Sequence, residues 1–188
     1  AFAPAAQATP SLLVDAVSLE VLRAKEAGRA WYPASTTKLM TAYVTFEQLQ
    51  AGRVALGQDV SFSRKALARE AVKSGLMPGS VMSLEDALYA MLGVSANEAA
   101  AAIAETVAGS EGGFVAMMND AARRLGMTGT HFVNPDGLFD RRQVTTARDM
   151  ALLGVAIDRN FPEYLRFFDR SQVSINGRVL KSSDEVLT

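Results

Sequence analysis

A serine and a lysine that can form a nucleophile–base pair lie three positions apart, as Ser35 and Lys38 at the start of an apolar stretch. Residues i and i+3 share one face of a helix, so the lysine amine can reach the serine hydroxyl. Burial by the apolar residues that follow would disfavour the charged amine and lower its pKa, which makes it a usable base. This spacing also occurs by chance about once in a chain of this length. Its alternative interpretation is an N-capping serine beside a surface lysine.

A second hydroxyl and an amide occur together sixty residues later, as Ser95 and Asn97 in Ser-Ala-Asn. The apolar residues from 84 to 92 recur with helical spacing, and the alanine-rich stretch 98–107 predicts another helix, so the motif connects two helices. The hydroxyl could relay a proton, and the amide could orient a substrate and the lysine. The alternative is an ordinary turn in which Asn97 is only the helix N-cap. A further Ser-x-Asn, 174–176, leads into Asn176-Gly177 and predicts a hairpin turn.

Four segments of the chain are similar to signature segments of the low-molecular-mass penicillin-binding proteins and follow one another in the same order. These proteins are the D-alanyl-D-alanine carboxypeptidases of the serine beta-lactamase-like superfamily. The four segments are residues 33–43, 94–97, 124–138 and 145–151. Several ordered motifs are far more specific than either triplet alone, and the resemblance covers about residues 11–180. It implies an α+β fold of the beta-lactamase/DD-peptidase type, in which a helical subdomain is inserted into an antiparallel sheet. The order of expected strands, then helices, then strands agrees with this class.

The third motif of this family, Lys-Thr-Gly on a strand that lines the site, does not occur in the sequence. The late run Lys181-Ser-Ser183 lacks the glycine, and the chain ends at Thr188. The resemblance therefore implies a DD-peptidase catalytic domain over residues 11–188 whose C-terminal strands are missing. In the family this strand binds the substrate carboxylate and supplies an oxyanion donor, and losing one such donor typically costs a factor of about 100 to 1000 in turnover.

The resemblance also implies roles for four residues. Ser35 would attack the penultimate D-alanine of a peptidoglycan stem peptide, and Lys38 would accept its proton. Ser95 would pass a proton to the departing D-alanine, while Asn97 would hold the substrate amide and the lysine. The reaction needs no cofactor or metal, and beta-lactams would acylate the same serine. Any membrane association would depend on a C-terminal segment beyond this chain.

Two alternatives to a carboxypeptidase remain from the sequence. A beta-lactamase shares both motifs, but class A enzymes usually have Ser-Asp-Asn and a deacylating glutamate, whereas this chain has Ala96 and no glutamate in 132–140. A non-catalytic cell-wall-binding relative would explain the absent third motif. The sequence does not separate carboxypeptidase from endopeptidase activity.

Composition excludes several other classes of site. The chain has no cysteine and one histidine, His131, so thiolate chemistry and a multi-histidine metal site are excluded. A net charge of −1 gives no electrostatic case for nucleic-acid binding. Residues 1–10 are small and apolar, and Ala6-Gln-Ala8 resembles a signal-peptidase site, which predicts a signal-peptide remnant or a disordered N-terminus. We therefore expect an exported, periplasmic or otherwise extracytoplasmic protein.

Overall fold

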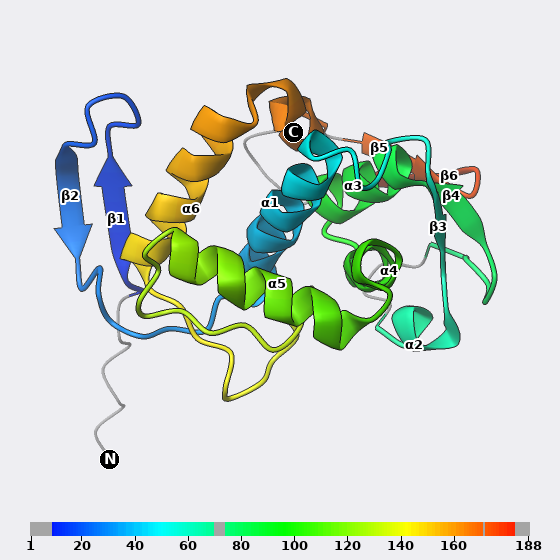
Figure 1. Ribbon diagram of the computed structural model, residues 1–188, viewed down its shortest axis with the longest axis horizontal. Helices are drawn as coiled ribbons and strands as arrows, with labels where there is room; N and C mark the ends of the chain where they lie inside the picture. Colours follow the sequence, from blue (N-terminus) through cyan, green and yellow to red (C-terminus); the bar gives the residue numbers. More distant parts are fainter. Residues whose placement is uncertain (1–8, 70–73, 171, 183–188) are drawn as a thin grey trace, which may run out of the picture.

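The fold is built around one buried helix, α1 (Thr37–Gln50), in the middle of Figure 1. The computed structural model describes residues 9–69, 74–170 and 172–182. Most side chains of α1 are buried, including polar ones, because helices α3, α4, α5 and α6 all contact it. A helix that is covered on every side can place reactive groups in a site while its other residues hold it rigidly in the core.

The other helical segments are no longer than α1, and several of them contact it. They are η1 (Ala34–Thr36), α2 (Arg64–Leu67), α3 (Leu84–Gly93), α4 (Asn97–Ala108), α5 (Glu111–Arg124), α6 (Ala147–Asn160) and η2 (Pro162–Phe168). Four of them begin at a serine or threonine whose hydroxyl accepts a backbone N–H three residues later, namely Ser63, Ser83, Ser110 and Thr146. These caps satisfy N–H groups that the first helical turn leaves without partners.

The described strands pair only two at a time, and every pair is antiparallel. The pairs are β1 (Ser11–Val14) with β2 (Val21–Lys25), β3 (Asp59–Ser61) with β4 (Val81–Ser83), and β5 (Gln172–Ile175) with β6 (Arg178–Lys181). The expected α+β class with antiparallel strand pairing is confirmed, and within the described residues each antiparallel sheet has two strands. Helix α6 lies against β1 and helix α3 lies against β5, so each of these two pairs packs on a helix (Figure 1).

The turn between β5 and β6 confirms the hairpin prediction. Asn176 and Gly177 have φ values of 50° and 74°. Two consecutive residues with positive φ form the turn that matches the twist of paired strands, and Asn-Gly is the preferred pair. The neighbouring Ser-x-Asn is therefore part of a hairpin rather than of a reactive site.

An aromatic cluster and the alanine-rich helix α4 make up much of the core. The ring of Phe46, on α1, lies 4.8 Å from that of Tyr164 and 5.7 Å from that of Phe161, centroid to centroid. On the other side, the alanines of α4 are almost fully buried against α1, α3 and α5. Small side chains let these helices approach closely, and this brings the start of α4 next to the start of α1.

A long irregular connection, 125–146, joins α5 to α6 and passes beside the start of α1. Asn119 anchors it to α5, since its side chain bonds both the N–H and the carbonyl of Phe132. Asp149, on α6, accepts the N–H of Gly129. The backbone of His131 takes part in a bridge with Val144, near the other end of the connection. The connection is thus held at both ends while its middle reaches the site.

The two ends of the chain lie partly outside the described residues. The prediction for residues 1–10 falls mostly on 1–8, which lie outside the described residues, as does Ser183. No helix among the described residues is both long and apolar enough to cross a bilayer.

Candidate active site

Ser35 and Lys38, the predicted nucleophile and base, lie within hydrogen-bond distance at the start of α1. Ser35 lies in the 3-10 turn η1, is exposed, and follows Ala34, whose φ is positive at 47°. Lys38 lies in the first turn of α1, and its Nζ is 3.3 Å from Ser35 Oγ. The spacing of three residues therefore places both groups on one face, as the sequence predicted.

Lys38 is buried, with 3% of its surface exposed. Burial lowers the pKa of its amine from 10.5 to about 8, although the negative charges of Asp136 and Glu98 act in the opposite direction. A lysine with this pKa is partly neutral near physiological pH, whereas an exposed lysine is almost entirely protonated. The buried environment thus lowers the pKa of Lys38 in the direction that a base would need.

The second motif meets the first across a separation of sixty residues. Ser95 Oγ lies 3.1 Å from Ser35 Oγ, and Asn97 Oδ1 accepts a hydrogen bond of 2.7 Å from Lys38 Nζ. The interpretation of Asn97 as an N-cap is wrong, because it is the first residue of α4 and Ala96 occupies the cap position. Ser95 has a φ of 57°. Its left-handed backbone is uncommon for serine and turns the chain sharply between α3 and α4.

The backbone carbonyl of Asp136 also contacts Lys38, at 2.6 Å from Nζ. A neutral amine has two N–H groups and one lone pair. If Asn97 Oδ1 and the Asp136 carbonyl accept the two N–H groups, the lone pair is left for the hydroxyl of Ser35. The surroundings of Lys38 therefore orient it as a proton acceptor.

Two residues next to this contact, Asp136 and Gly137, were not assigned a role from the sequence. The Asp136 side chain is fully buried and accepts the N–H of Leu138 and an N–H of Arg69. Gly137, with a φ of 89°, packs directly on the backbone of Ala34 and Ser35. The only sequence signal for them is their place within the signature segment 124–138.

Ser35 opens onto a cleft of about 420 Å³. Its lining comes from the start of α1, the end of α3, Ser95 and Ser182. Ser182 directly follows β6, so the last described residue of the chain reaches the cleft. A cleft that exposes the Ser35 hydroxyl while Lys38 stays buried suits attack on an incoming carbonyl group.

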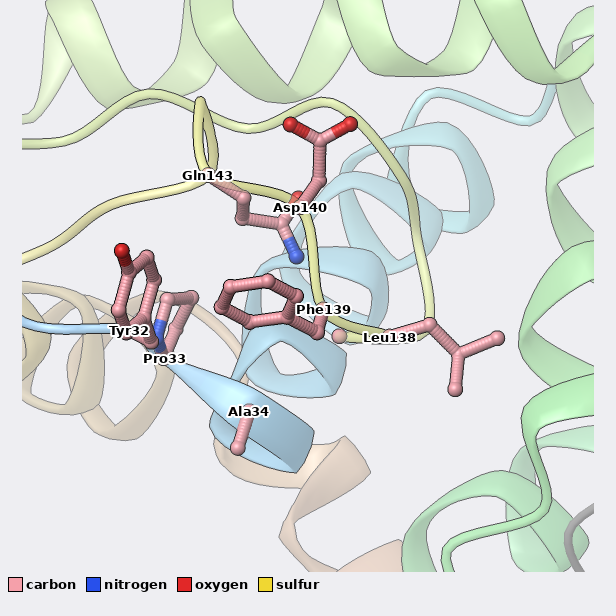
Figure 2. Close-up of a pocket in the computed structure, with 8 residues that line it drawn as sticks. Tyr32, Pro33, Ala34, Leu138, Phe139, Asp140 and Gln143 are labelled. Atoms are coloured by element: carbon pink, nitrogen blue, oxygen red, sulfur yellow. The ribbon is translucent and has the colours of Figure 1, made fainter.

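A smaller hollow of about 70 Å³ is lined by residues 32–34, before Ser35, and by residues 137–140 and 143 of the connection (Figure 2). Tyr32 and Phe139 stand side by side at its mouth, with ring centroids 4.9 Å apart in an edge-to-face arrangement. The exposed pair of Tyr32 and Phe139 thus lies where the segment before Ser35 contacts the 125–146 connection.

Within the described part of the chain, no group of three histidine, cysteine, aspartate or glutamate side chains is placed to hold a metal ion. The reactive groups at Ser35 are instead two hydroxyls, one amine and one amide, which are the groups of nucleophilic acyl transfer.

Known proteins with similar sequences and structures share this arrangement of segments. The D-alanyl-D-alanine carboxypeptidase DacC of Escherichia coli (strain K12) is 36% identical over 180 residues, which are 93% of this chain and 45% of DacC. The structure of penicillin binding protein 5 from Haemophilus influenzae superimposes with a TM-score of 0.91 at 30% identity, over 100% of this chain and 55% of that one. The chain thus spans about half the length of these relatives.

A ligand-bound structure is also similar. Penicillin-Binding Protein D2 from Listeria monocytogenes, in the ampicillin-bound form, superimposes with a TM-score of 0.84 at 27% identity, over 96% of this chain and 73% of that one. The sequence model of the D-alanyl-D-alanine carboxypeptidase family matches residues 1–187. This match and the identity to DacC show that the chain belongs to the D-alanyl-D-alanine carboxypeptidase family of low-molecular-mass penicillin-binding proteins.

Proposed function

We propose that the protein is a serine D-alanyl-D-alanine carboxypeptidase that removes the terminal D-alanine of peptidoglycan stem peptides. The observation that carries this proposal is the convergence of Ser35, Lys38 and Ser95 at hydrogen-bond distances. Family membership supports the same activity, since DacC has this name.

In the acylation step, Ser35 Oγ attacks the carbonyl carbon of the penultimate D-alanine as its proton moves to Lys38 Nζ. The backbone N–H of Ser35 would donate to the developing oxyanion. The peptide C–N bond then breaks, and Ser95 relays the proton held by Lys38 to the departing amine, which leaves Lys38 neutral again. The products are free D-alanine and an ester between Ser35 and the shortened peptide.

In the deacylation step, water gives a proton to Lys38 and attacks the ester carbonyl. The bond between this carbon and Ser35 Oγ breaks, Lys38 returns the proton to Ser35, and the shortened peptide leaves as a carboxylate. Asn97 keeps Lys38 oriented through its Oδ1, which leaves the lysine available to take a proton from water. The Asn97 side chain would also contact the substrate amide. No cofactor is needed for either step.

Beta-lactams are the proposed inhibitors, because their ring amide resembles the D-alanyl-D-alanine end and can acylate Ser35. The similarity to an ampicillin-bound structure supports this expectation. Because peptidoglycan lies outside the cytoplasmic membrane, we propose an extracytoplasmic location, periplasmic where there is an outer membrane. Recovery of the native protein only in the cytoplasmic fraction would contradict this location.

The deciding experiment is labelling with penicillin, followed by intact-mass spectrometry and by assay of D-alanine release from a stem-peptide mimic. We expect one covalent adduct, which is lost in Ser35→Ala. As a matched control, Ser18→Ala removes an exposed turn serine and should label normally. An adduct on Ser35→Ala would contradict the assignment of the nucleophile.

The same measurements of labelling and of D-alanine release also distinguish the alternative functions. Labelling without D-alanine release would favour a non-catalytic relative, and rapid release of opened penicillin would favour a beta-lactamase. A cross-linked dimer of stem peptides tests endopeptidase activity alongside the carboxypeptidase substrate.

A further inference from the structure

A chain of charged groups leads away from Lys38 on the side opposite Ser35. The Asp136 carbonyl accepts from Lys38 Nζ, and its carboxylate accepts from an Nη atom of Arg69 at 2.7 Å. The other Nη atom of Arg69 bonds both oxygens of Glu111, at 2.8 and 3.0 Å. Lys65 lies on the outside and contacts only the Glu111 carboxylate, at 2.8 Å. One residue, Asp136, therefore connects this network to the proposed base.

The burial of these groups increases towards the site. The side-chain exposure is 63% for Lys65, 21% for Arg69 and 0% for Asp136. A buried carboxylate is strongly unfavourable without a partner, so Asp136 depends on Arg69, while the exposed Lys65 contributes little.

Resting on the function proposed above, we propose that Arg69 is a positioning residue for acylation: it holds and charge-balances Asp136, whose carbonyl orients Lys38. Arg69 comes from the segment after α2, and Asp136 comes from the connection between α5 and α6. Their ion pair thus fixes this connection where it meets the start of α1.

The charge of Arg69 affects Lys38 in a definite direction. Asp136 and Glu98 are the negative groups that raise the pKa of Lys38 against the effect of burial. Asp136 belongs to the 125–146 connection and Glu98 to α4. Without Arg69, the full charge of Asp136 would act on the lysine and stabilise its protonated form. Arg69 therefore keeps more of the lysine in the neutral form that can accept a proton.

The test is the rate of acylation by a fluorescent penicillin as a function of pH, measured on the full chain with wild-type and variant sequences. In Arg69→Gln, we expect the midpoint of the rate profile to rise by about one pH unit and the rate at pH 7 to fall about tenfold. Arg69→Lys retains a charge and should recover part of this loss. Lys65→Gln is the matched control, because it touches the same network only through Glu111 and should keep the wild-type midpoint.

A second pair of variants keeps the test decisive if Arg69→Gln does not fold. Asp136→Asn removes the negative charge and should move the midpoint below the wild-type value. Arg69→Gln combined with Asp136→Asn removes both charges, and its midpoint should return towards the wild type. Thermal melting shows which variants are folded.

Two results would overturn the inference. One is an unchanged midpoint in folded Arg69→Gln, and the other is the same midpoint in Asp136→Asn and in the double variant. If the wild type itself is not acylated, the proposed function fails instead, so the two failures are distinguishable. A structural role alone would lower the rate equally at every pH and would leave the midpoint in place.

Discussion

Gly137 lies directly against Ala34, the residue before the proposed nucleophile. A Cβ built on Gly137 would overlap the carbonyl group of Ala34 and would lie 3.1 Å from the backbone nitrogen of Ser35. Both residues have positive φ, 89° for the glycine and 47° for the alanine. The shape of the turn that presents Ser35 thus depends on a residue a hundred positions away in sequence.

The first prediction is that Gly137→Ala displaces this turn. The new methyl group meets backbone atoms, which cannot move aside as a flexible side chain can, and the positive φ adds strain of about 1 kcal/mol or more. We expect a lower melting temperature and at least a tenfold loss of penicillin acylation. The control is Gly52→Ala, which has a φ of 65° but no atom within 4 Å of the added methyl. Equal acylation by the two variants would show that the contact does not position Ser35.

The second prediction concerns the pH dependence given by Lys38. Its pKa of about 8 lies below the ordinary value, so the neutral base becomes more abundant as the pH rises through 8. At pH 7 only about a tenth of the amine is neutral, and the acylation rate should rise almost tenfold between pH 7 and 9. Lys38→Arg keeps the charge but cannot act as a base, so it should abolish this rise together with acylation. A flat profile in the wild type would contradict the role of Lys38.

The third prediction tests the aromatic cluster that supports α1. Phe46 is fully buried among the rings of Phe161, Tyr164 and Phe167. Phe46→Ala leaves a cavity and should lower the free energy of unfolding by about 3 to 5 kcal/mol, measured by denaturant titration. Phe139→Ala is the matched control, since that ring is 71% exposed and should cost less than about 1 kcal/mol. A similar decrease in the free energy of unfolding for both variants would mean that the aromatic cluster does not stabilise α1.

The features that the sequence predicted correctly involve residues that are close together in the sequence. Ser35 and Lys38 are one helical turn apart, so helical spacing alone brings them together. The turn at Asn176-Gly177 follows from the backbone freedom of these two residue types. The helix over residues 84–93 follows from its apolar periodicity.

The contacts that the sequence did not predict are long-range and depend on backbone atoms. Lys38 bonds the carbonyl of Asp136, a group that every residue has, so the identity of residue 136 gives no signal for this contact. The pairing of Arg69 with Asp136 joins two irregular segments that have no periodicity. The packing of α6 on β1 and of α3 on β5 is likewise long-range, and strand patterns do not reveal it.

The last prediction separates the hydroxyl of Ser95 from its backbone. This residue has a φ of 57°, and its Oγ is 3.1 Å from Ser35 Oγ. If the hydroxyl passes the proton to the leaving amine, Ser95→Ala and Ser95→Gly should both slow D-alanine release from a stem-peptide mimic, by a factor of about 100.

Both variants lack the hydroxyl, and they differ only in the Cβ methyl group, which restricts the backbone. Glycine relieves the positive φ and alanine does not, so Ser95→Gly should melt at the same or a higher temperature than Ser95→Ala. Nearly equal losses of turnover at different melting temperatures would assign the effect to the missing hydroxyl. Recovery of turnover in the glycine variant would instead show that the backbone turn, and not the proton relay, is what Ser95 contributes.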